Sequence, residues 1–117
     1  ESMFESGSSN ITPRIQSLIG MIAKSIEDLP NSLSISGHTD SSAFNASDYS
    51  NWELSSDRAN ASRRALLDAG LKSDRIEKVA GRADTDPLIA DDPSNPGNRR
   101  ISIILLRETP VLPPNLK

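Results

Sequence analysis

Apolar and polar positions repeat along the chain with two different periods, and each period predicts one kind of element. Between Ile15 and Leu29, apolar residues recur every three or four positions, which predicts one amphipathic helix. Thr12 suits the N-cap of this helix, and Pro13 suits its first position, where a missing N–H group has no consequence. Pro30 then predicts the end of the helix.

Strands are indicated by a period of two. The segment Leu33–His38 alternates apolar and polar residues, which predicts a strand with one apolar face. Residues 76–81 form a second strand candidate. The nearly continuous apolar run 101–106 is typical of a central strand that is covered on both faces. Met3–Phe4 fits a short edge strand at the start of the chain.

A second helix is predicted to begin after Ser50, because Ser50 and Glu53 have the spacing of a capping box. Its buried stripe starts at Leu54 and continues through small and apolar residues. Arg58 follows Leu54 by four residues, so we expect it on the same side of the helix and near its start. Gly70 suits the left-handed position after the last helical turn.

The predicted order is strand, helix, strand, helix, strand, loop, strand. This order gives an α/β (α+β) two-layer sandwich with both helices on one face of the sheet. We expect residues 1–107 to form one domain and residues 108–117 to form a proline-rich C-terminal tail. Two long polar loops, residues 41–49 and 83–98, lead to the hypothesis that they open or close a groove.

Composition narrows the classes of function. Hydrophobic residues make up 35% and charged residues 25% of the 117 positions, as expected of one globular domain with a modest core. The net charge of -3 argues against nucleic-acid binding, because phosphates require a basic surface. The absence of cysteine excludes disulfides, thiolate metal sites and a cysteine nucleophile. With a single histidine and no EF-hand spacing among the aspartates, we expect no metal or other cofactor.

The sequence shows no membrane-spanning segment and does not begin with methionine. No run approaches the roughly 20 apolar residues of a membrane-spanning helix. The chain begins at Glu1 instead of a methionine, so we interpret it as a fragment. Any targeting or membrane segment would then lie upstream of it.

Asp40 and Arg58 are the strongest candidates for a binding site. Asp40 directly follows a strand, and Arg58 lies about two turns into the next helix, whose N-terminus faces the same edge of the sheet. A carboxylate accepts hydrogen bonds from an ammonium group, and a guanidinium donates two to a carboxylate, so the pair could recognise a small zwitterion. The alternative is a structural salt bridge or a loop cap, and spacing alone does not separate the two interpretations.

Other polar residues are weaker candidates. Ser36, His38 and Asp40 do not form a hydrolase triad, because there is no nucleophile elbow and their spacing along one strand is wrong, so we expect a locally hydrogen-bonded histidine. Asn98 and one following arginine are either only polar residues that precede the last strand, or they brace a loop of the site. Trp52 is expected to pack in the core.

Four spaced motifs resemble the OmpA-like peptidoglycan-binding domain, over about residues 3–107. They are Gly37-His38-Thr39-Asp40, Asn51-x-x-Leu54-Ser55-x-x-Arg58-Ala59, Gly81 and Asn98-Arg99-Arg100-Ile101. The sequence from Tyr49 to Ser55, with Arg58-Ala59-Asn60 after it, is most similar to that of MotB-type flagellar motor stator proteins.

The resemblance implies a βαβαβ–β sandwich with a mixed sheet. It also implies non-covalent binding of peptidoglycan through the diaminopimelate-containing stem peptide. Matched by position, the resemblance implies that Asp40 and Arg58 hold the diaminopimelate head group. It implies that Thr39, Asn51 and Leu54 line the groove, and that Asn98 and Arg99 flank it.

A stator role implies a wider context. The domain would be the periplasmic part of an inner-membrane protein, would form a homodimer, and would join a MotA-type subunit through an upstream segment absent from this chain. A peptidoglycan tether of an OmpA- or Pal-like outer-membrane protein is the alternative. A wall hydrolase is disfavoured, because the candidate pair includes no arrangement that activates water, so we expect no enzyme activity.

Overall fold

The structure, a computed structural model that describes residues 3–42 and 48–107, is built from two helices and three strands in that part of the chain. In chain order the elements are α1 (Pro13–Ile26), β1 (Leu33–His38), α2 (Asn51–Asp68), β2 (Ile76–Gly81) and β3 (Arg100–Leu105). Single 3-10 turns lie at Ser73–Arg75 and Pro96–Asn98.

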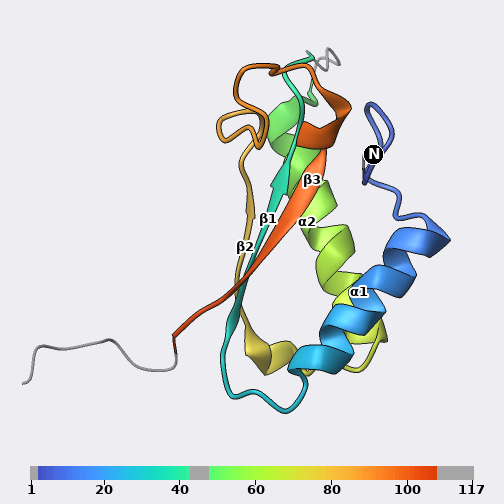
Figure 1. Cartoon of the computed structure of the whole chain (residues 1–117), viewed down its shortest axis with the longest axis vertical. Coiled ribbons are helices and arrows are strands. Elements are labelled where there is room, and N and C mark those ends of the chain that lie inside the picture. The colour runs from blue at the N-terminus through green and yellow to red at the C-terminus, as the bar shows by residue number, and fades with distance from the viewer. Residues whose placement is uncertain (1–2, 43–47, 108–117) are drawn as a thin grey trace, which may run out of the picture.

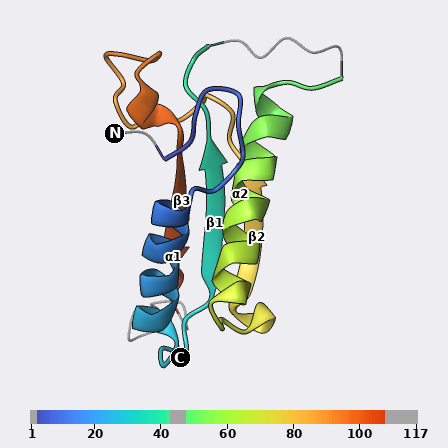
Figure 2. The same cartoon turned by 90° about the vertical axis from the view of Figure 1, so that its right-hand side faces the viewer.

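The strands form one sheet in the order β2-β1-β3. β1 pairs parallel with β2 and antiparallel with β3, so the sheet is mixed. Both helices pack against the same face of this sheet (Figures 1 and 2). The predicted two-layer sandwich with helices on one face is therefore confirmed.

The predicted strand at Met3–Phe4 is wrong. These residues form a bend, and the Phe4 side chain is buried instead of lying on a sheet edge. The Phe4 carbonyl accepts a hydrogen bond from the Arg99 side chain at 2.7 Å, so it is not part of a strand ladder. A segment of two residues is short for a strand, and here the Arg99 side chain takes the Phe4 carbonyl that a neighbouring strand would need.

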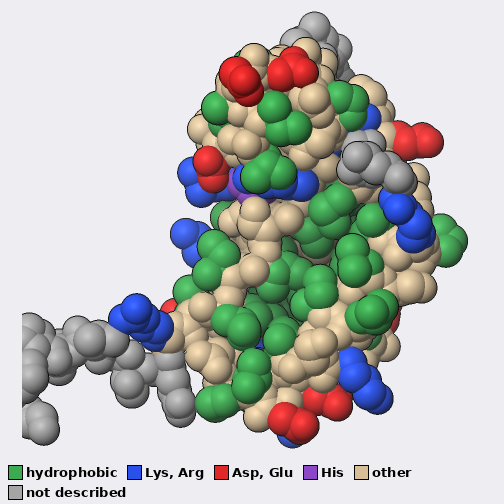
Figure 3. Space-filling model, in the orientation of Figure 1, with side chains coloured by type: hydrophobic (Ala, Val, Ile, Leu, Met, Phe, Trp, Pro, Cys, Tyr) green, Lys and Arg blue, Asp and Glu red, His purple; other side chains and the backbone are tan. Residues whose placement is uncertain are grey.

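The prediction that residues 101–106 form the central strand is also wrong. Among the described strands, β3 pairs only with β1 and lies at the edge of the sheet, while β1 is central. Its apolar run is divided between two environments: Ile101 and Ile103 pack against the core, and Ile104 and Leu105 are exposed. Apolar side chains gather on the surface between β3 and α1 (Figure 3).

Local capping signals set the helix starts as predicted. Thr12 Oγ1 accepts a hydrogen bond from the N–H group of Ile15 at the start of α1. Ser50 and Glu53 form a complete capping box at the start of α2. α1 ends at Ile26, earlier than the pattern indicates, because the Ile26 carbonyl accepts hydrogen bonds from Arg75 and from the backbone of Leu29.

Gly37 allows α2 to pack unusually close to β1. A Cβ atom at Gly37 would lie 1.9 Å from the Ser55 carbonyl oxygen, and a Cβ atom at Gly81 would also overlap Ser55 and Ser56. Only glycine avoids these overlaps. The close approach brings the N-terminal half of α2, which carries Arg58, against the end of β1. No helix in the described residues is long and apolar enough to cross a lipid bilayer.

Candidate functional site

Arg58 is completely buried where the N-terminal half of α2 meets the end of β1. A buried guanidinium needs hydrogen-bond acceptors, and three backbone carbonyl groups provide them. Nη1 donates to His38 at 3.1 Å, Nε donates to Ser8 at 2.8 Å, and Nη2 donates to Glu5 at 3.1 Å. Burial first, and the charge of Arg99 second, lower the pKa of Arg58 to about 10, so the group stays charged at neutral pH.

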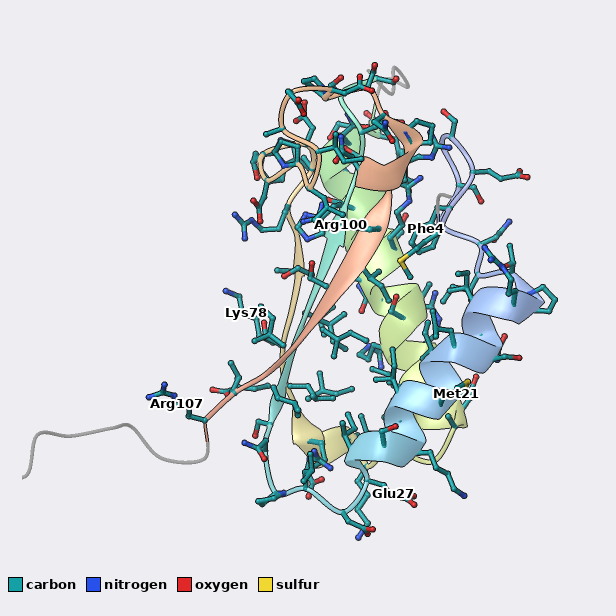
Figure 4. The ribbon with its side chains drawn as sticks, in the orientation of Figure 1. Phe4, Met21, Glu27, Lys78, Arg100 and Arg107 are labelled. Carbon is teal, nitrogen blue, oxygen red and sulfur yellow. The ribbon has the colours of Figure 1, made fainter. Side chains whose placement is uncertain are left out.

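The segment Phe4–Ser8, which precedes α1, holds both arginines of the site. The Phe4 ring lies against the Arg58 guanidinium, with 4.9 Å between the ring centroid and Cζ, which is a cation–π contact. The Phe4 carbonyl accepts the 2.7 Å bond from Nε of Arg99. Figure 4 shows Phe4 on the side of this segment that faces the start of β3. The segment therefore forms one wall of the site.

Asp40 is paired with Arg99, and not with Arg58. Nη1 of Arg99 donates to Oδ2 of Asp40 at 2.8 Å, and both side chains are largely buried. The N–H group of Ser42 donates to the other carboxylate oxygen at 2.9 Å. Within the described residues no direct ion pair joins Asp40 to Arg58, so a salt bridge between those two does not explain their positions.

The two charged groups nevertheless border the same small hollow, whose volume is about 40 Å³. Every predicted site residue except Asn98 lines it, together with residues of the N-terminal segment and of the loop after β1. The lining residues are Ser6, Gly7, Thr39, Asp40, Ser42, Asn51, Leu54, Arg58 and Arg99. The structure thus brings together residues that are far apart in the sequence.

The hollow is chemically mixed. Thr39 is buried, and its hydroxyl group has no hydrogen-bond partner in the described part of the chain. The Asn51 amide donates to the Ser42 carbonyl at 3.0 Å, and Leu54 adds an apolar surface. A carboxylate, two guanidinium groups, a hydroxyl and an apolar side chain can bind a small group that carries both charges. Among the described residues, no group of three or more metal-binding side chains gathers.

Asn98 is fully buried but lies outside the lining of the hollow. Its Oδ1 accepts a 2.8 Å bond from the N–H group of Ile89, and its Nδ2 donates to the carbonyls of Asp92 and Pro93, each at 3.1 Å. The Pro93 carbonyl also accepts a bond from the N–H group of Ser41. Asn98 therefore braces the 83–98 loop against the segment that follows Asp40.

Two further predictions have opposite outcomes. The single histidine, His38, is buried and its Nε2 lies 3.1 Å from the hydroxyl oxygen of Ser102, so it is hydrogen-bonded as expected, but to the neighbouring strand β3 and not locally in the sequence. Trp52 is 55% exposed, so its predicted place in the core is wrong. It lies in the first turn of α2, where its N–H group donates to the Ser50 hydroxyl at 3.1 Å and its carbonyl accepts from the hydroxyls of Ser55 and Ser56.

The segment Phe4–Ser8 is a part of the site that the sequence motifs do not indicate. It contacts Arg58 through backbone carbonyl oxygens, and every residue type presents the same carbonyl. A Ser- and Gly-rich stretch gives no pattern that would indicate this use. Phe4 is the residue that could have indicated this part of the site, because an aromatic ring beside a polar loop is suited to cover a buried cation.

Comparison with known proteins identifies the family. A model of the OmpA family matches residues 3–101. The chain belongs to the OmpA family. It is 43% identical over 108 residues to Motility protein B of Escherichia coli K12, which covers 91% of this chain and 35% of that protein. The chain therefore spans about a third of that curated relative.

Solved structures agree with this assignment. The C-terminal domain of Helicobacter pylori MotB superposes with a TM-score of 0.79 at 21% identity, over 92% of this chain and 85% of that one. The cell wall anchor of the type VI secretion system from Pseudomonas aeruginosa superposes with a TM-score of 0.73 at 27% identity, over 91% and 76% of the two chains. The OmpA-like fold expected from the motifs is confirmed.

Proposed function

We propose that this domain binds peptidoglycan non-covalently and holds the diaminopimelate head group of a stem peptide between Asp40 and Arg58. The observation that carries the proposal is the shared hollow, which an acid from the end of β1 and a buried cation from α2 both border. Membership of the OmpA family and similarity to a cell wall anchor of known structure also support it.

The chemistry of the ligand matches the residues. The side-chain end of diaminopimelate carries an ammonium group and a carboxylate on one carbon atom. Asp40 accepts hydrogen bonds from the ammonium group, and Arg58 donates two to the carboxylate. The Thr39 hydroxyl, which has no partner among the described residues, gains one from the ligand, and Leu54 contacts the aliphatic chain. Asn51 and Arg99 complete the lining, and Asn98 holds the adjacent loop.

Binding requires the segment Phe4–Ser8 to shift. One water molecule needs roughly 10–15 Å³ of cavity, so a hollow of about 40 Å³ holds only a few. A complete head group with its peptide needs more room. Ser6 and Gly7 line the hollow, and the carbonyls of Glu5 and Ser8 occupy the Arg58 donors. The ligand carboxylate replaces these two carbonyl groups when the segment moves away.

The relatives suggest a place for this activity. We propose that the domain is the periplasmic part of an inner-membrane protein and anchors a flagellar stator to the wall. In this proposal the protein forms a homodimer and also binds a MotA-type subunit through another segment. Similarity to Motility protein B supports this context. The alternative is a wall tether of an OmpA- or Pal-like outer-membrane protein. A membrane helix upstream in the whole protein favours the stator, whereas a barrel or a lipid anchor favours the tether.

Co-sedimentation with purified diaminopimelate-type peptidoglycan tests the proposed binding. The wild-type domain is expected to pellet with the wall, while Asp40→Asn and Arg58→Lys remain in solution. Asp40→Asn keeps the size of the side chain but removes its charge. Arg58→Lys keeps the charge but loses the planar donor fork.

Two variants on the exposed side of α2 serve as matched controls. Asp68→Asn and Arg64→Lys make the same chemical changes away from the hollow, so both should pellet like the wild type. Thermal unfolding of every variant shows whether a loss of binding reflects a loss of folding. Wild-type protein that stays in solution, or site variants that pellet normally, would contradict the proposal. We expect no release of muropeptides during these incubations, because the site has no group placed to activate water.

A further inference from the structure

The face of the sheet opposite the helices is rich in basic groups, although the chain carries a net charge of -3. Strand register places alternate residues of all three strands on this face. None of the paired positions on this face carries an acid, although Glu77 lies at the register shift between β1 and β2. The residues on this face are Ser34, Ser36 and His38 from β1, Lys78 and Ala80 with the following Arg82 from β2, and Arg100, Ser102 and Ile104 from β3.

The upper end of this face contains polar atoms without partners. His38 is 2% exposed, and its Nδ1 atom has no hydrogen-bond partner among the described residues. His38 is the register partner of Arg100, whose Nη1 atom is buried and equally unpaired in that part of the chain. Arg82 extends the adjacent strand, because its N–H group donates to the Gly37 carbonyl. Such atoms are unusual and indicate a missing partner.

The charges around His38 favour an anion. Arg100 has the largest electrostatic effect on the histidine, the carboxylate of Asp86 opposes it, and Arg82 adds a smaller effect of the same sign as Arg100. Figure 3 shows the purple histidine near blue basic side chains, with a red acidic side chain beside them. Burial first, and Arg100 second, lower the pKa of His38 to about 4, so the ring is neutral at pH 7. When the Ser102 hydroxyl donates to Nε2, the ring proton lies on Nδ1 and is available as a donor.

We propose that Arg82, Arg100 and His38 Nδ1 form a second binding site, which holds a further carboxylate of the same wall polymer. This inference rests on the proposed function, because peptidoglycan supplies the carboxylates. Guanidinium groups fit a carboxylate with two parallel hydrogen bonds, and small neighbours such as Ser36 and Ala80 leave this face flat. In Figure 4, Lys78 extends from the sheet on the side away from α1, which continues the basic surface downward.

The position of the second site suits an extended ligand. Thr39 and Arg99 line the first hollow, and their chain neighbours His38 and Arg100 belong to the second site. Successive side chains of a strand point to opposite faces, so the two sites lie back to back at one end of the sheet. A polymer that passes over this end contacts both, whereas a single short peptide contacts only the first.

The test compares a polymer with a short ligand. The double variant Arg82→Gln/Arg100→Gln is expected to bind phosphate-free peptidoglycan sacculi about three- to tenfold more weakly than the wild type. Its affinity for a soluble diaminopimelate tripeptide should be unchanged. The control Arg64→Gln/Lys72→Gln removes the same charge elsewhere and should bind both ligands like the wild type.

Each outcome is decisive. Unchanged binding of sacculi by the double variant, an equal loss in the control, or a loss seen only on sacculi that carry phosphate polymers would overturn the proposal. A wild-type domain that does not bind the tripeptide would instead refute the first site. Nitrogen NMR of the single histidine gives an independent readout: we expect the Nδ1–H tautomer and a shift on adding sacculus fragments. The Nε2–H tautomer would contradict the role of His38 as a donor.

Discussion

Arg99 donates a 2.8 Å hydrogen bond from Nη1 to Oδ2 of Asp40, and the same guanidinium donates from Nε to the Phe4 carbonyl. One side chain therefore joins the acid of the proposed site to the N-terminal segment that covers it. Asp40 does not need Arg58 as its counter-ion. Both charges of the site are consequently in place before a ligand arrives.

The Arg99–Asp40 pair should contribute measurably to stability. Arg99→Gln leaves the largely buried carboxylate without its charged partner, so we expect the free energy of unfolding to fall by about 2–3 kcal/mol. Arg64→Gln, which changes an exposed arginine on α2, should change it by less than about 0.5 kcal/mol. Urea unfolding at pH 7 measures both values. Equal stability of the two variants would show that the pair contributes little.

The close packing of α2 on β1 is testable with two glycines. In Gly37→Ala the new methyl group overlaps the Ser55 carbonyl, so we expect a loss of about 2–4 kcal/mol or a failure to fold. Gly20 lies in α1, and a Cβ atom there would meet no other atom within 4 Å, so Gly20→Ala should stabilise the protein by about 0.5–1 kcal/mol. Thermal unfolding distinguishes these opposite signs, and a tolerated Gly37→Ala would refute the close approach.

Asn98 should act on the loop more than on the ligand. Asn98→Ala leaves several backbone groups of the 83–98 loop without partners, so we expect a loss of about 2–3 kcal/mol and faster amide exchange at Ile89. Asn10→Ala, at an exposed position, is the control. Amide exchange detected by NMR measures the local effect. Unchanged protection of Ile89 would show that Asn98 is not a brace.

The buried histidine predicts a pH dependence of stability. Its pKa is about 4 in the folded protein and near 6.5 when unfolded, so the unfolded chain binds more protons between these values. Stability therefore falls as the pH drops from about 6.5 toward 4, by at most about 3 kcal/mol from this group. His38→Gln should lose the part of this slope between pH 6.5 and 5, where few carboxylates titrate. An identical slope in both proteins would contradict the neutral buried ring.

Local signals in the sequence account for most of the fold. The Thr12 cap and the Ser50–Glu53 capping box are short-range chemistry, and the helix starts they predict are confirmed. Period-two alternation similarly identifies β1. Periodicity does not reveal which strands are neighbours, and for that reason the apolar run of β3 indicates a central strand although β3 lies at the edge. Residues 43–47 and the predicted tail 108–117 lie outside the described residues.

The site is predictable only in part. Spacing from Leu54 brings Arg58 to the buried side of α2, and Asp40 follows directly from the strand pattern. The partners of these groups come from distant segments: Arg58 bonds Ser8 and Glu5, and Asp40 bonds Arg99. No short-range pattern encodes such contacts. The sequence does not place Trp52 either, because one aromatic residue in a first helical turn can face either side.

The central claim is that the hollow recognises both charges of one head group. Isothermal titration of the domain with two soluble tripeptides tests it most directly. The peptides differ only at the third position, where one has diaminopimelate and the other has lysine, which keeps the ammonium group but lacks the second carboxylate. We predict that the diaminopimelate peptide binds and that the lysine peptide binds at least about tenfold more weakly, because Arg58 then has no carboxylate to hold. Equal affinity for the two peptides, or no binding of either, would contradict the claim.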